Sequence, residues 1–151
     1  MRVPSAGVTS ILGIDIGGTG IKSALVDVSV GELISDRHRT DTPKPATAEA
    51  VGDVLAAHRD HFGWDGPVGC AYPGVVRRGK VLTAANLDKG WIGLEAEQVF
   101  GERLGSDTVV LNDADAAGLA EVRFGAAKDV AGTVIVIITK SEISKASAKL
   151  I

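Results

Sequence analysis

Apolar residues occur in short runs over much of this chain, and these runs predict β-strands. They are rich in valine, isoleucine and leucine or alternate with polar residues, and glycine, proline or aspartate follows most of them. Strands are therefore expected at residues 10–16, 21–28, 33–39, 68–72, 107–111 and 133–138. A further hairpin is expected around the basic turn Arg77-Arg78-Gly79-Lys80, which two valine-rich pairs flank.

Other segments place apolar residues at helical spacing. Thr47 is an expected N-cap, and the apolar residues Ala50, Val51, Val54 and Leu55 follow it on one face of a helix that reaches His61. Further helices are expected at residues 94–104 and from residue 112 to about residue 124. Three strands in a meander, then helix, strand, helix, strand and helix, match one lobe of an actin-like ATPase (ribonuclease-H-like) fold. The expected class is α/β with a mixed sheet.

The first strand ends in a carboxylate followed at once by a glycine turn. Asp15 precedes the run Gly17-Gly18-Thr19-Gly20, and a second strand then begins. Glycine permits a positive φ and leaves no Cβ between backbone N–H groups and an anion, and a carboxylate suits Mg²⁺. The turn matches neither a P-loop nor a Rossmann fingerprint, because no G-K-[ST] triplet is present and no helix follows. We predict a phosphate-binding turn, and the alternative is a plain glycine-rich hairpin.

A second group of polar residues follows the strand at residues 107–111. Asn112 and Asp113 stand at its carboxyl end, before a helix that starts with alanines and Gly118. Asn112 offers a donor and an acceptor to sugar hydroxyls, and Asp113 could take a hydroxyl proton as a general base. The alternative is that these residues only cap the helix.

Composition narrows the function classes. The 151 residues carry a net charge of −3 and are 45% hydrophobic, which suits one folded domain and argues against bulk nucleic-acid binding. One cysteine, Cys70, cannot form an internal disulfide or a cysteine zinc site. We expect neither a membrane span nor a signal peptide, and therefore a cytoplasmic location.

Four segments in order resemble a ROK-family sugar kinase, and within that family the polyphosphate glucokinases. They are residues 15–22, Tyr72-Pro73-Gly74, residues 85–93 and residues 111–118. The resemblance implies phosphorylation of glucose at its 6-hydroxyl, with polyphosphate and often ATP as donor and Mg²⁺ as cofactor. It also implies a homodimer in full-length relatives.

The resemblance also implies roles for individual residues. Asp113 matches the catalytic base, and Asn112 lies beside it on the sugar. Asp15 matches the carboxylate at the Mg²⁺–phosphate end, and Asn86 and Gly74 lie in segments that approach the sugar. The anion-binding turn matches Gly17, Gly18, Thr19 and Gly20. Lys22 could face phosphate or be an ordinary strand-surface lysine, and the basic turn at residues 77–80 could follow a polyanion or be solvated.

The resemblance stops after residue 137. Family members are about twice as long and continue into a second phosphate loop of the type L-G-T-G-I-G, whereas this chain has no glycine after Gly132. The expected division is a kinase lobe at residues 1–138, truncated before the second lobe, and a polar tail at 139–151 from a frameshift or premature stop. An inactive remnant with weak sugar binding or self-association is therefore the alternative function. A repressor of the same family is disfavoured, because a strand beginning near residue 10 leaves no room for a helix-turn-helix.

Overall fold

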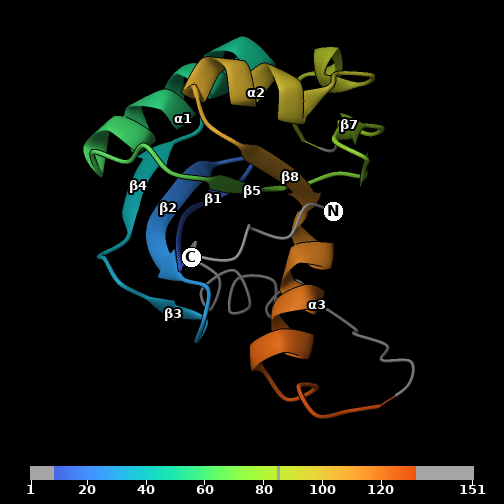
Figure 1. Cartoon of the computed structure of the whole chain (residues 1–151). Helices are drawn as coiled ribbons and strands as arrows, with labels where there is room; N and C mark the ends of the chain where they lie inside the picture. The colour runs from blue at the N-terminus through green and yellow to red at the C-terminus, as the bar shows by residue number, and fades with distance from the viewer. Residues whose placement is uncertain (1–8, 85, 132–151) are drawn as a thin grey trace.

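The described part of the chain, residues 9–84 and 86–131 of a computed structural model, is built on one mixed sheet (Figure 1). The sheet order is β3-β2-β1-β5-β8. β4 pairs with the same edge of β2 as β3 does, at the other end of that strand. β1 runs antiparallel to β2 and parallel to β5, and β5 runs parallel to β8. The elements are β1 Ser10–Ile16, β2 Gly20–Asp27, β3 Glu32–Leu33, β4 His38–Asp41, α1 Ala48–His61, β5 Val68–Tyr72, β6 Val76–Arg77, β7 Lys80–Val81, α2 Ala96–Leu104, β8 Thr108–Asn112 and α3 Asp113–Phe124. A single 3₁₀ turn spans Lys89–Trp91.

Helices α1 and α2 cover one face of the sheet, and α3 lies on the other side (Figure 1). Alternation along β1 directs Leu12, Ile14 and Ile16 into the core beneath α1 and α2, where each is at most 1% exposed. The aromatic rings of Trp91 and Phe100 fill the same core. The opposite face of β1 therefore carries Asp15 toward the side on which α3 lies.

Most of the expected elements are confirmed. The strands at residues 10–16 and 68–72 have the expected bounds. β2 and β8 are each shifted by about one residue from the expected ranges 21–28 and 107–111. Thr47 caps α1 as predicted, because its Oγ1 accepts a hydrogen bond of 3.2 Å from the N–H of Ala50. The hairpin around residues 77–80 is also present, and α2 begins two residues later than expected.

The expected continuous strand at residues 33–39 was wrong. It is split into β3 and β4, which pair with successive parts of the same edge of β2. Between them the Oγ of Ser35 accepts the N–H of Leu25 at 2.9 Å, so a side chain replaces a backbone partner. Ile34 is left 53% exposed at this break.

Some predictions lie outside the described residues. These are the strand at residues 133–138, the domain boundary at 138 and the polar tail, and they stay predictions. Within the described ranges, no helix is both long enough and apolar enough to cross a membrane.

A buried histidine connects α1 to the sheet. His58 is 0% exposed, and its Nδ1 lies 2.6 Å from Ser23 Oγ while its Nε2 lies 2.8 Å from Thr40 Oγ1. Burial, and then the neighbouring rings of His38 and His61, lowers the pKa of His58 to about 4. The imidazole is therefore neutral in the folded protein at neutral pH.

Acid should destabilise the fold through His58. The unfolded chain takes up this proton below a pKa of about 6.5, whereas the folded protein takes it up only near 4. The free energy of unfolding should therefore fall as the pH falls through this window, by roughly 2 kcal/mol at pH 4.5. Urea unfolding from pH 7 to 4.5 measures this slope. His58→Gln keeps hydrogen-bonding groups without the titration and should flatten it, and equal slopes in the two proteins would contradict the assignment.

Candidate functional site

The predicted site residues meet at one edge of the sheet, where the parallel strands β1, β5 and β8 end. Asp15 lies beside Ala71 in register, and Tyr72 lies beside Asn112. The glycine turn after β1, the Gly74 turn after β5 and the start of α3 after β8 therefore share this edge. In a sheet of this type, the loops that follow parallel strands are the usual place for ligands.

Close contacts, and not a left-handed backbone conformation, explain why glycine occupies this turn. None of Gly17, Gly18 and Gly20 has a positive φ, which corrects one reason for expecting glycine there. The N–H of Gly17 donates to the carbonyl of Gly20 at 3.0 Å, and a Cβ on Gly17 would lie 2.6 Å from that oxygen. A Cβ on Gly20 would lie 2.6 Å from Nη2 of Arg39. Backbone therefore excludes a side chain at Gly17, whereas a side chain at Gly20 would require the half-exposed Arg39 to move. Thr19, between them, is exposed.

Asn86 lies next to this turn. A Cβ on Gly18 would be 3.5 Å from the Cβ of Asn86, which is ordinary van der Waals distance. The segment that carries Asn86 is anchored by Trp91, which is fully buried and donates from Nε1 to the carbonyl of Ala46 at 2.8 Å. The structure thus brings the predicted sugar segment to the predicted phosphate turn.

Gly74 packs against backbone. A Cβ there would lie 2.5 Å from the carbonyl oxygen of Thr83 and 2.7 Å from Cε1 of Tyr72. The carbonyl of Gly74 accepts a hydrogen bond of 2.8 Å from Nδ2 of Asn112. Gly74 and Asn112 are therefore tied together across the ends of β5 and β8.

Asn112 caps α3, as the alternative interpretation proposed. Its Oδ1 accepts the N–H of Asp115 at 3.1 Å while its Nδ2 holds Gly74. The amide has a second N–H, which is the group that the predicted sugar contact would use. Capping and sugar binding are therefore compatible in this residue.

Asp113 is the first residue of α3 and is partly buried. Its Oδ1 accepts the N–H of Ala114 at 2.8 Å. This bond orients the carboxyl group of Asp113 at the N-terminus of its own helix. A second carboxylate oxygen is present for a proton from a substrate.

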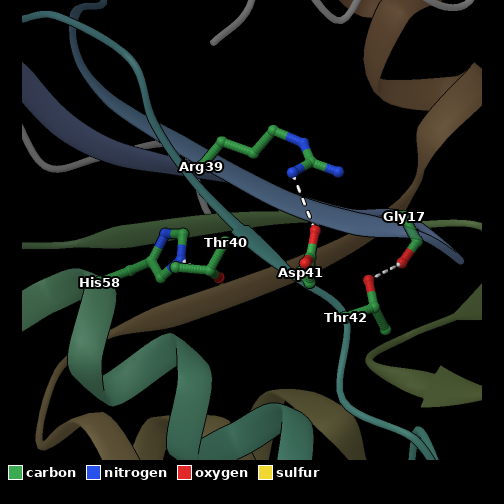
Figure 2. A network of polar contacts seen from close by, with 6 residues as sticks. All are labelled: Gly17, Arg39, Thr40, Asp41, Thr42 and His58. Carbon is green, nitrogen blue, oxygen red and sulfur yellow. Dashed lines mark hydrogen bonds and ion pairs between the residues drawn. The ribbon is translucent and has the colours of Figure 1, made fainter.

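Two cations share the face of the sheet on which Asp15 lies. Asp15 lies opposite Lys22, and Lys22 lies opposite Arg39, so the three side chains project from the same face of adjacent strands. Arg39 forms an ion pair of 2.9 Å with Asp41 (Figure 2). Its guanidinium group also lies beside Gly20. Arg39 is not among the site residues that the sequence predicts. The only signal for it in the sequence is the short basic run Arg37-His38-Arg39.

The basic cluster at residues 77–80 is exposed to solvent. Arg77, Arg78 and Lys80 are exposed on the β6–β7 turn, and Lys80 forms an ion pair of 2.7 Å with Glu95. Arg78 and Gly79 have φ values of 51° and 78°, typical of a tight hairpin turn. The cluster is therefore an exposed hairpin turn, and contact with a polyanion there stays a prediction.

Asp15 is the candidate ligand for a divalent cation. The described residues contain no group of three or more His, Cys, Asp or Glu side chains that could hold a metal ion by themselves. Mg²⁺ does not need such a group, because it usually retains several waters and binds through one or two carboxylates and substrate phosphates. A single carboxylate beside an anion-binding turn fits that coordination.

A cavity of about 210 Å³ lies between α3 and the sheet, with Asp113 at its border. Its other lining is mostly apolar, including Leu111, Leu119 and Phe124. A sugar needs several polar partners, so this cavity is unsuited to glucose. The polar residues at the strand ends are the better candidates.

Comparison with known proteins identifies the family. Residues 11–140 match the family described as "ROK family". The chain belongs to the ROK family. The observed mixed sheet is therefore that of the actin-like ATPase fold of ROK sugar kinases, as the element order predicted.

Several relatives are similar over most of this chain. A polyphosphate glucokinase of Mycobacterium tuberculosis is 51% identical over 135 residues, which cover 89% of this chain and 51% of that protein. The inorganic polyphosphate/ATP-glucomannokinase of Arthrobacter sp. strain KM has a TM-score of 0.78 at 43% identity, over 83% of this chain and 53% of that one. A ROK glucokinase of Streptomyces griseus, solved with glucose and AMPPNP, has a TM-score of 0.67 at 38% identity, over 78% and 37%. This ROK chain spans about half the length of the polyphosphate glucokinases that it matches.

Adding a methyl group at two glycines of the site should have different effects. Gly74→Ala forces a Cβ against backbone and should cost about 1–3 kcal/mol of stability. Gly18→Ala meets only ordinary contact with Asn86 and should cost less than about 1 kcal/mol. Urea unfolding of both variants measures the difference. Equal losses would show that the Gly74 turn relaxes more easily than its contacts indicate.

Proposed function

We propose that this chain contributes the catalytic base and the first phosphate turn of a ROK kinase that phosphorylates glucose at its 6-hydroxyl. Polyphosphate is the proposed donor, and ATP is a possible second one. The observation that carries the proposal is the meeting of the glycine turn, Gly74, Asn86 and Asp113 at one sheet edge. The 51% identity to a polyphosphate glucokinase supports the choice of substrates.

In this mechanism Asp113 accepts the proton of the glucose 6-hydroxyl while the hydroxyl oxygen attacks the terminal phosphorus of the donor. The bond from that phosphorus to the bridging oxygen breaks, and the shortened polyphosphate leaves with the bonding electrons. Asn112 and Asn86 orient the sugar, and N–H groups of the glycine turn bind the terminal phosphate. Asp15 would hold Mg²⁺, which when bound offsets negative charge on the donor phosphates.

The test is formation of glucose 6-phosphate by the protein that carries this sequence. It is assayed with polyphosphate or with ATP, in the presence of Mg²⁺, after removal of host kinases. Product formed with either donor supports the kinase proposal. Glucose binding in a calorimeter without any product would instead favour the alternative of a non-catalytic sugar-binding domain.

Donor choice gives a separate prediction. Polyphosphate should support the reaction at least as well as ATP, and its apparent affinity should fall as salt rises, because several phosphates are neutralised at once. Lys22 and Arg39 are the cations nearest the turn in strand register. The measurement is the KM for each donor between about 50 and 300 mM salt. Activity with ATP alone would exclude polyphosphate as the donor and leave the sugar-kinase proposal standing.

Three further expectations belong to this proposal. They are a kinase lobe at residues 1–138, a homodimer in the full-length form of such a kinase, and a cytoplasmic location. Each rests on the resemblance or on composition alone. Size-exclusion chromatography with light scattering tests the dimer directly.

A further inference from the structure

Thr42 contacts the glycine turn twice from outside the turn itself. It follows β4, is 5% exposed, and donates from Oγ1 to the carbonyl of Gly17 at 2.6 Å (Figure 2). Its backbone N–H donates to the carbonyl of Thr19 at 3.2 Å. Thr42 therefore holds two carbonyl groups of the turn, those of Gly17 and Thr19.

These contacts matter because the turn is rich in glycine. Glycine loses more conformational freedom on folding than other residues, so a turn with three of them needs bonds that fix it. The hydrogen bond from the N–H of Gly17 to the carbonyl of Gly20 closes the turn from within. The hydroxyl of Thr42 adds a short, partly buried bond to Gly17 from the segment that follows β4.

The direction of the held carbonyl has a consequence for anion binding. A trans peptide group directs its N–H opposite to its C=O. The bond from Thr42 to the carbonyl of Gly17 therefore turns the N–H of Gly18 away from β4. Gly18 is the residue of the turn that lies beside Asn86.

Backbone pairing of β4 with β2 places Thr42 beside the turn, and separate side-chain bonds tie β4 to α1. Thr40 bonds through Oγ1 to Nε2 of His58 at 2.8 Å, and His58 bonds to Ser23 of β2. Asp41 lies opposite Gly20, which puts the end of β4 next to the turn. Figure 2 shows the bond between His58 and Thr40 and the bond between Thr42 and Gly17.

We propose that Thr42 is a positioning residue for the phosphoryl donor, because it holds the glycine turn with the Gly18 N–H directed toward the terminal phosphate. The inference rests on the proposed function for its ligand. The ordering of the turn by Thr42 does not depend on that function. Two measurements therefore separate the ordering of the turn from donor binding.

The first measurement is amide hydrogen exchange in the ligand-free 151-residue chain. Thr42→Val keeps the shape and the backbone N–H but loses the hydroxyl. It should raise exchange of the Gly17 N–H about tenfold, which corresponds to about 1.4 kcal/mol. Thr42→Ser restores a hydroxyl and should remain within about threefold of the original. Thr40→Val, two residues earlier in β4, is the matched control, because it removes a hydroxyl that bonds His58 and not the turn.

The second measurement is the kinetics of the same variants with polyphosphate, ATP and glucose. Thr42→Val should lower kcat/KM for the donor by about tenfold, with the KM for glucose within about twofold. Thr40→Val should lower thermal stability and leave the donor KM unchanged. Unchanged exchange at Gly17 in Thr42→Val, or the same donor effect in both valine variants, would overturn the positioning role. Raised exchange in a protein that forms no product would support the ordering by Thr42 and refute the proposed function instead.

Discussion

Replacing Asp113 with Asn should lower kcat for glucose phosphorylation by about 10²–10⁴-fold, the usual contribution of a general base. The substitution removes the group that accepts the proton and retains Oδ1, which accepts the N–H of Ala114. The helix should therefore still form, with a loss of at most about 1 kcal/mol from the lost interaction with the helix dipole. The KM for glucose should change by less than about threefold, because the sugar contacts are assigned to Asn112 and Asn86.

Asp115→Asn is the matched control for this experiment. Asp115 lies in the same first turn of α3 and is exposed, and it has no assigned contact with substrate. Its backbone N–H, which bonds Asn112, survives the substitution. Activity of Asp115→Asn should stay within about twofold of the original. An Asp113→Asn variant with comparable activity would remove Asp113 from the mechanism.

The sequence predicted the sheet well because its strands are specified locally. Leu12, Ile14 and Ile16 alternate with residues of the opposite face, and this period is visible without knowing any partner strand. Thr47 and Asn112 are also local signals, since each caps a helix that begins with the next residue. These features placed β1, β5, α1 and α3 within about two residues, as expected for strong local patterns.

The break between β3 and β4 was not predictable in the same way. It depends on the hydroxyl of Ser35 reaching the N–H of Leu25 ten positions away. A serine in this mostly polar segment gives no indication of which backbone group it will bond. The expected single strand failed for that reason.

The same limit applies to the site. Asp15, the glycine turn and Asp113 are recognisable because their residue types and spacing are chemical signatures. Arg39 and Thr42 reach the turn only through the pairing of β4 with β2, a contact between distant segments. The reason for a glycine at position 17 is also visible only in the folded structure, because it is the closeness of the Gly20 carbonyl and not a positive φ.

The largest effect on stability is expected at Trp91. Its ring centroid lies 5.0 Å from that of Tyr72 and 5.6 Å from that of Phe100, and it is fully buried. Trp91→Ala should cost about 3–5 kcal/mol of unfolding free energy, since it removes a large ring and leaves a cavity. Urea unfolding measures the loss. A cost below about 1 kcal/mol would show that the surrounding rings collapse to fill the space.

A milder change at Trp91 separates packing from positioning of the sugar segment. Trp91→Phe keeps a ring but removes the Nε1 bond of 2.8 Å to Ala46, which anchors the segment that carries Asn86. Trp64→Phe removes a similar bond of 2.9 Å, to Pro67, in the loop after α1. Each should cost about 1 kcal/mol of stability, because each leaves a backbone carbonyl without its indole partner. Of the two variants, only Trp91→Phe should also raise the KM for glucose, by about three- to tenfold. The Trp91 bond anchors the segment that carries Asn86, and the Trp64 bond does not. If both variants leave the glucose KM unchanged, Asn86 does not depend on this anchor for its place in the site.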